Sequence, residues 1–182
     1  MEKKDVQQII HEWKQEKNIK LYTPLKYFDG LKSKQKIRMK LQEMYRFKNE
    51  KDPSKIHFES DKGIKNTKKS HYHTLFETRF KTPSSASLKV KSNVTGVPEE
   101  ILKIVERKGQ GAWKSGHRPG TNAIQWGKAR VDSFLTFGCT AYSGDKSLMD
   151  QVRKIQPRSK ELKYFFQQKP SCPKSKLKNY SS

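Results

Sequence analysis

Apolar residues recur at steps of three and four in several separate stretches of the chain, and this spacing predicts amphipathic helices. One such helix is predicted from Val6 to about Asn18, with Asp5 placed to cap its start. A second is predicted from Ser33 to Phe47, where lysines surround a narrow apolar edge. Because a lone amphipathic helix is marginal in water, the first must dock on its own domain or on another protein.

The apolar pattern is most regular between residues 96 and 156. It predicts a helix with Pro98 at its first position that ends at Gly109, a second helix capped by Thr121 or Asn122 that ends at Gly138, and a third, capped by Asp145, that runs to about Ile155. These three helices are expected to form one compact unit around a glycine-rich basic loop.

The rest of the chain shows little period. Residues 50–92 are rich in lysine, serine and histidine, and residues 82–87 have the composition of a linker. Only 32% of the residues are hydrophobic, which favours a small core with long extensions. We therefore expect a mainly α protein with a basic N-terminal arm over 1–95, a compact helical domain over 96–156 and an extended basic C-terminal arm over 157–182.

The formal net charge of the 182-residue chain is +22, which implies an anionic partner. Nucleic acid, an anionic membrane surface and acidic protein surfaces all fit this charge. No apolar run is long enough to span a bilayer, and the N-terminus has no signal-peptide core. The two cysteines, Cys139 and Cys172, make no disulfide framework, so we expect a reducing compartment.

Residues with catalytic or metal-binding chemistry form no recognisable motif. His71 and His73 are two residues apart, but no cysteine or carboxylate stands at zinc-site spacing from them. The carboxylates are scattered, and no signature supports Cys139 and His117 as a nucleophilic pair. We expect no catalytic residue, no metal, no cofactor and no enzymatic activity.

The glycine-rich stretch is a candidate anion-binding loop. Its glycines could form a backbone-amide nest beside several cations, while the alternative is a structural turn that packs Trp113. The candidate residues of the loop are Lys108, Gly109, Gly111, Lys114 and Arg118. The structural residues are Trp113, Trp126, Arg130 and Phe134, of which Arg130 is expected to reach back to the carbonyl groups of the loop.

Aromatic and aliphatic anchors in the N-terminal arm are candidates for partner binding. Such side chains bury large areas once a partner supplies a pocket. The candidates are Ile9, Ile10, Trp13, Tyr22, Tyr27 and Phe28.

Three motifs of the glycine-rich stretch resemble an uncharacterised family of large DNA viruses that infect algae and protists. They are Lys-Gly-x-Gly-Ala-aromatic from Lys108, Ser-Gly-x-Arg-Pro from Ser115, and Trp-x-x-Ala-Arg from Trp126. The resemblance covers roughly residues 22–150 and includes a Tyr-x-Pro anchor at Tyr22. Trp113 stands where a tyrosine is more usual in this family. The family offers no activity to carry over, and the resemblance implies a viral source and a virion component.

The first functional hypothesis is a non-enzymatic minor capsid protein of a large DNA virus. It would cement major and minor capsid proteins through its basic arms, on the inner side of the virion capsid, after assembly in the host cytoplasm. The alternative is a virion protein that binds nucleic acid without sequence preference and tethers or condenses the genome.

Overall fold

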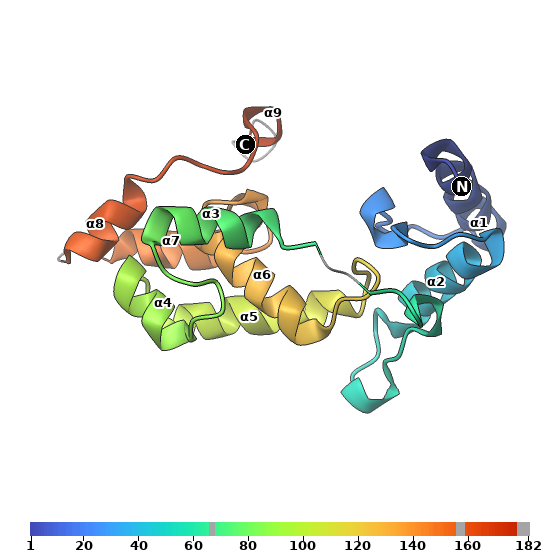
Figure 1. Ribbon diagram of the computed structural model, residues 1–182, viewed down its shortest axis with the longest axis horizontal. Helices are drawn as coiled ribbons and strands as arrows, with labels where there is room; N and C mark the ends of the chain where they lie inside the picture. Colours follow the sequence, from blue (N-terminus) through green and yellow to red (C-terminus); the bar gives the residue numbers. More distant parts are fainter. Residues whose placement is uncertain (66–67, 156–158, 178–182) are drawn as a thin grey trace. The chain divides into compact units, whose positions relative to one another are not determined.

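The computed structural model describes residues 1–65, 68–155 and 159–177, and over these ranges the regular elements are helices without any strand (Figure 1). The predicted mainly α fold is therefore confirmed. The chain divides into two compact units. Unit 1 comprises Met1–Thr67 and Gly111–Ala123, and unit 2 comprises Lys68–Gln110 and Ile124–Ser182. This division differs from the three consecutive parts that the sequence predicted.

Unit 1 is built on two helices that lie side by side, α1 (Lys3–Lys17) and α2 (Lys34–Phe47). The short helices η1 (Leu25–Phe28), η2 (Pro53–Lys55) and η3 (Glu59–Asp61) complete it. Ser33 caps α2 by accepting a hydrogen bond from the backbone N–H of Lys36, as its position before the apolar stripe predicts. The buried residues of α1 are those of the predicted apolar stripe, namely Val6, Ile9, Ile10 and Trp13.

Five of the six predicted partner anchors therefore lie in the interior of unit 1. Ile9, Ile10, Trp13, Tyr27 and Phe28 are each less than a tenth exposed. Burial also raises the pKa of Tyr27 to about 12, because the phenolate is poorly solvated there. Tyr22 alone, 76% exposed, remains at the surface. The sequence showed that these side chains need a pocket, but it did not show that the same chain supplies it.

Unit 2 contains the larger core. Its elements are α3 (His71–Phe80), α4 (Leu88–Thr95), η4 (Cys139–Tyr142), α7 (Lys146–Lys154), α8 (Lys160–Phe166), α9 (Lys174–Leu177), and the parts of α5 (Glu99–Trp113) up to Gln110 and of α6 (Ala123–Leu135) from Ile124. Residues from α3, α5, α6, α7 and α8 share one hydrophobic cluster, in which Phe134 is fully buried as predicted. Phe165 of α8 is fully buried in the same cluster, so this part of the predicted C-terminal arm belongs to the folded unit.

The predicted glycine-rich loop is in part a helix. α5 continues through Gly109 and Gly111 to Trp113, and the loop begins only after it. The reason lies in packing: a Cβ atom on Gly109 would stand 2.7 Å from the Cα atom of Gly127 in α6. Glycine at both positions therefore lets the backbones of α5 and α6 approach closely, rather than ending a helix.

The end of α6 also differs from the prediction. The residue with left-handed backbone is Phe137, with φ of 54°, while Gly138 has an ordinary φ of −66°. Gly138 is required for space, because a Cβ atom there would meet the Ser133 hydroxyl group. None of the helices within the described ranges is long and apolar enough to cross a membrane.

Candidate functional site

A few charged side chains of both signs lie in the interior of the two units, and most of the others lie nearer the surface. Asp132 and Asp145 are fully buried, and the Asp61 side chain is only 12% exposed. Among the described lysines and arginines, only Lys40 and Lys91 are buried. The interior takes up about as many basic as acidic side chains, so the surface keeps the strongly basic balance of the sequence.

In unit 1, Asp61 lies between a buried lysine and a buried histidine. The Lys40 ammonium group donates to both carboxylate oxygens of Asp61 at 2.8 Å, and its Nζ is 3.0 Å from Nε2 of His117. The His117 ring stacks on Trp113 with ring centroids 4.2 Å apart. This cluster joins α2, η3 and the loop after α5 into one unit.

Burial and the Lys40 charge favour a neutral imidazole in His117, whereas its hydrogen bonds with Asp61 and Trp113 favour the charged ring. Its Nδ1 is 2.8 Å from the carbonyl oxygen of Trp113, so Nδ1 carries the proton and Nε2 can accept from Lys40. Burial lowers the pKa of His117, and the nearby Lys40 charge lowers it further against the opposing effect of Asp61. Burial alone would raise the pKa of Asp61, but the bond with His117 and the charge of Lys40 outweigh it and lower the pKa.

Unit 2 contains a second cluster of the same three residue types. The Lys91 ammonium group donates to one oxygen of Asp132, and Nδ1 of His73 lies 2.6 Å from the other oxygen. Lys91 also lies over the ring of Phe76, 4.9 Å from its centroid. The cluster joins α3, α4 and α6, and it neutralises a carboxylate that is completely removed from water.

The sequence predicted that Arg130 reaches back to carbonyl groups of the glycine-rich stretch, but Arg130 binds Asp145 instead. Its Nε donates to Oδ2 of Asp145 at 2.9 Å and its Nη2 donates to Oδ1 at 2.8 Å. This two-point bond joins α6 to the start of α7. Burial made the need for a partner predictable, but the partner lies 15 residues further along the chain and had no local signal.

The five residues of the predicted anion-binding loop are not assembled into a nest. Lys108, Gly109 and Gly111 lie in α5. In unit 1, Lys114 donates to the carbonyl oxygen of Glu50, and Arg118 pairs with Asp29 at 3.6 Å. The structural alternative describes this region better, because Trp113 is partly buried and donates from Nε1 to the carbonyl oxygen of Thr121. Trp126, the other predicted structural tryptophan, is also partly buried.

The charge is strongly one-sided at the C-terminal end of the described chain. We call residues 153–155 and 159–177 the C-terminal basic segment. Glu161 is its single acidic residue, and all of its basic side chains are exposed. Those basic residues are Arg153, Lys154, Lys160, Lys163, Lys169, Lys174 and Lys176.

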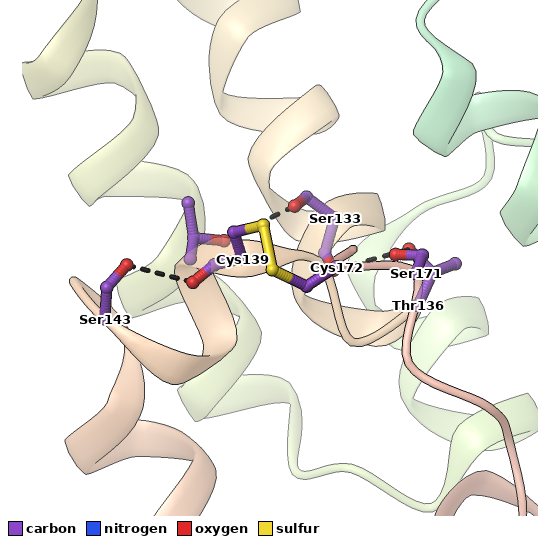
Figure 2. Close-up of a disulfide and its surroundings, with 7 residues drawn as sticks. Ser133, Thr136, Cys139, Ser143, Ser171 and Cys172 are labelled. Carbon is purple, nitrogen blue, oxygen red and sulfur yellow. Dashed lines mark hydrogen bonds between the residues drawn. A yellow bond between two sulfur atoms is a disulfide. The ribbon is translucent and has the colours of Figure 1, made fainter. Parts of the chain in front are cut away.

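A disulfide between Cys139 and Cys172 attaches the far part of this segment to unit 2 (Figure 2). Beside the bond, the backbone N–H of Cys172 donates to the carbonyl oxygen of Phe137, and that of Ser171 donates to Thr136 and Phe137, at distances from 3.1 to 3.2 Å. The hydroxyl group of Ser143 donates to the carbonyl oxygen of Cys139. No local pattern in the sequence indicated this bond, because 33 residues separate the two cysteines and no spacing pattern links them.

No group of three or more potential metal ligands comes together among the residues that the structure describes. His71 and His73 lie on α3, and Nδ1 of His73 is within hydrogen-bond distance of Oδ2 of Asp132.

One family model, that of the family of unknown function DUF5824, matches residues 24–156. Because the match covers more than half of the chain, the chain belongs to this family. The matched range contains Asp61, Asp132 and Asp145 with the basic residues that neutralise them, whereas α1 and Cys172 lie outside it. No curated protein and no solved structure matches the chain.

Proposed function

We propose that this protein binds nucleic acid without sequence preference, as a non-enzymatic component that tethers or condenses a genome. The observation that carries the proposal is the strongly basic surface: the chain has a net charge of +22, and among the described lysines and arginines only Lys40 and Lys91 are buried. A surface of this kind attracts the phosphate backbone and releases its counterions, whatever the base sequence.

The C-terminal basic segment is the part of the surface to which we assign most of the binding. Its basic side chains are exposed to solvent, and the ion pair of Arg153 with Asp150 at 3.0 Å is also exposed. By contrast, α1 carries Asp5, Glu12 and Glu16 among its lysines, so it offers a more balanced surface.

A test compares two variants of equal net charge. The first replaces Lys160, Lys163, Lys169 and Lys174 by glutamine. The second, the matched control, replaces Lys3, Lys4, Lys14 and Lys17 of α1. Binding to a mixed-sequence DNA duplex is measured by fluorescence anisotropy over a series of salt concentrations.

We expect the first variant to lose much more affinity than the control. The slope of log K against log salt should also become shallower, by roughly 0.9 for each phosphate contact that is lost. Equal losses in the two variants would mean that binding is not centred on the C-terminal basic segment. An unmodified protein that does not bind duplex DNA at low salt would end the proposal.

A second proposal is that the protein cements capsid subunits of a large DNA virus, as its resemblance to a family of such viruses implies. Two surface features support it. Tyr22 is 76% exposed, and a shallow groove of about 460 Å³ runs along α2 between Lys34 and Gln42. The burial of the other anchors weakens it, because those side chains already have a pocket.

The two proposals differ in what Tyr22 does. If the protein cements capsid subunits, Tyr22→Ala should reduce its incorporation into particles while DNA binding stays unchanged. If it binds nucleic acid, incorporation should follow the lysines of the C-terminal basic segment instead. Quantifying both variants in purified particles separates the two.

A further inference from the structure

The last part of the C-terminal basic segment depends on the disulfide for its attachment. Among residues 169–177, Cys172 is the only one with a buried side chain, and Lys169, Lys174 and Lys176 are all exposed. The part that precedes it is held differently, because α8 places Leu162 and Phe165 in the core of unit 2. The disulfide therefore fixes residues 169–177, and α8 does not need it.

Without the disulfide, the remaining attachment is weak. It includes the backbone bonds of Ser171 and Cys172 to Thr136 and Phe137, a contact of the Ser171 and Thr136 hydroxyl groups at 3.5 Å, and contacts between α9 and η4. A terminal segment with so few buried side chains opens readily in local fluctuations. Cys139 is only partly buried, which gives a reductant a route to the bond.

From these observations we propose that Cys139–Cys172 is a redox-operated latch for the basic residues 169–177. With the bond closed, Lys169, Lys174 and Lys176 are held against unit 2 as part of a preformed basic surface. With the bond open, they become a tethered, mobile tail. This inference rests on the proposed function, because it assigns a regulation to the same polyanion-binding surface.

The chemistry of opening is a thiol–disulfide exchange with a dithiol. One thiolate of the dithiol attacks a sulfur of the Cys139–Cys172 bond, and the mixed disulfide that forms is resolved by the second thiol. The dithiol loses two electrons and two protons and becomes a disulfide, while Cys139 and Cys172 each gain a hydrogen as free thiols. Closing is the reverse reaction and requires a disulfide oxidant.

The effect on binding follows from preorganisation. Lysines that are already held in place lose little conformational entropy when they meet phosphate groups, whereas a mobile tail must be ordered first. We therefore expect the closed form to bind DNA several-fold more tightly than the open form at the same salt concentration. A protein of this kind would bind its genome more firmly in an oxidising compartment than in a reducing one.

The test uses the full chain in three forms: oxidised, reduced with a phosphine, and the double variant Cys139→Ser/Cys172→Ser. Hydrogen exchange in peptides from residues 169–177 shows whether this segment is held against unit 2. Exchange in peptides from α6 shows whether the core of unit 2 stays folded. Anisotropy with a mixed-sequence DNA duplex reports binding.

In the two open forms, exchange in residues 169–177 should rise about tenfold or more while α6 stays protected. Unchanged exchange in residues 169–177, or loss of protection in α6 as well, would overturn the latch. Faster exchange without a change in DNA affinity would overturn its role in binding.

A further comparison separates this inference from the proposed function. Lys169→Gln/Lys174→Gln/Lys176→Gln in the oxidised chain should weaken binding and abolish most of the effect of reduction. If no form of the protein binds DNA, the proposed function fails even though the exchange data still report the latch.

Discussion

Nε2 of His117 lies 2.7 Å from Oδ2 of Asp61 although the imidazole is fully buried. A protonated ring could donate a hydrogen bond to this carboxylate, but Lys40 already does so through a full positive charge. A second buried cation would therefore be repelled by the first. The folded state of unit 1 favours neutral His117.

This relationship predicts a pH dependence of stability. Because the pKa of His117 is lowered on folding, the unfolded chain binds a proton at pH values where the folded chain does not. The stability that neutral His117 contributes to the folded state is fully present above the ordinary histidine pKa of about 6.5. It is lost as the pH falls from there through the lowered pKa of His117 in the folded state. For one proton the slope cannot exceed about 1.4 kcal/mol per pH unit.

Urea denaturation between pH 5 and 8 measures this dependence. His117→Gln should remove most of the slope below about pH 6.5, because glutamine can form similar hydrogen bonds without titrating. His57→Gln serves as the control, since His57 is exposed. A slope that persists in His117→Gln would place the responsible group elsewhere.

Loss of the Asp132 carboxylate should strongly destabilise unit 2. Asp132→Asn leaves the ammonium group of Lys91 buried without a counter-charge, and removing one partner of a buried pair costs about 3–5 kcal/mol. The matched control is Asp150→Asn, because its pair with Arg153 is exposed on both sides and should contribute less than about 1 kcal/mol. The free energies of unfolding of Asp132→Asn and Asp150→Asn, each compared with that of the unmodified protein, test this difference.

The double variant Lys91→Met/Asp132→Asn gives an independent check. If the loss comes from an unpaired buried charge, removing that charge should restore part of the stability. A double variant that is less stable than Asp132→Asn alone would contradict this explanation.

Arg130→Lys should destabilise unit 2 by about 1–3 kcal/mol, because lysine cannot form the two-point bond with the buried carboxylate of Asp145. Arg153→Lys is the control, since its carboxylate partner is exposed. Thermal unfolding of both variants measures the difference. Equal melting temperatures for Arg130→Lys and the unmodified protein would show that the second hydrogen bond is dispensable.

The helices that the sequence predicted well are those with a regular apolar stripe. The predicted limits for α2 and α7 agree with the structure to within one residue, because Ser33 and Asp145 stand directly before the stripe. α3 and α4 were missed. Both are short, and polar or charged residues such as His73 and Lys91 point into the interior, where they interrupt the apolar period.

Long-range partners account for most of what sequence reasoning could not find. Nothing in the local pattern around Lys40 indicates that Asp61 and His117 will neutralise and cover it. The cysteine pair and the pocket for Trp13 are of the same kind, because each depends on residues brought together by the fold. The charge of +22 was visible at once, whereas the buried positions of Asp132 and Asp145 were not.

The two glycines of α5 should respond to the same substitution with opposite signs. In Gly109→Ala the new methyl group would stand 2.7 Å from the Cα atom of Gly127, and a backbone atom cannot move aside as the end of a flexible side chain can. Overpacking of this kind typically costs about 1–3 kcal/mol.

Gly111→Ala places the same methyl group where no atom lies within 4 Å. Alanine should there stabilise the helix by about 0.5–1 kcal/mol, because glycine loses more backbone entropy on folding. Urea denaturation of the two variants measures both changes under identical conditions. If Gly111 belonged to an irregular anion-binding loop, as the sequence suggested, Gly111→Ala would lower stability or leave it unchanged. A gain in Gly111→Ala together with a loss in Gly109→Ala is expected only if α5 is helical through both positions and packs against α6 at the first.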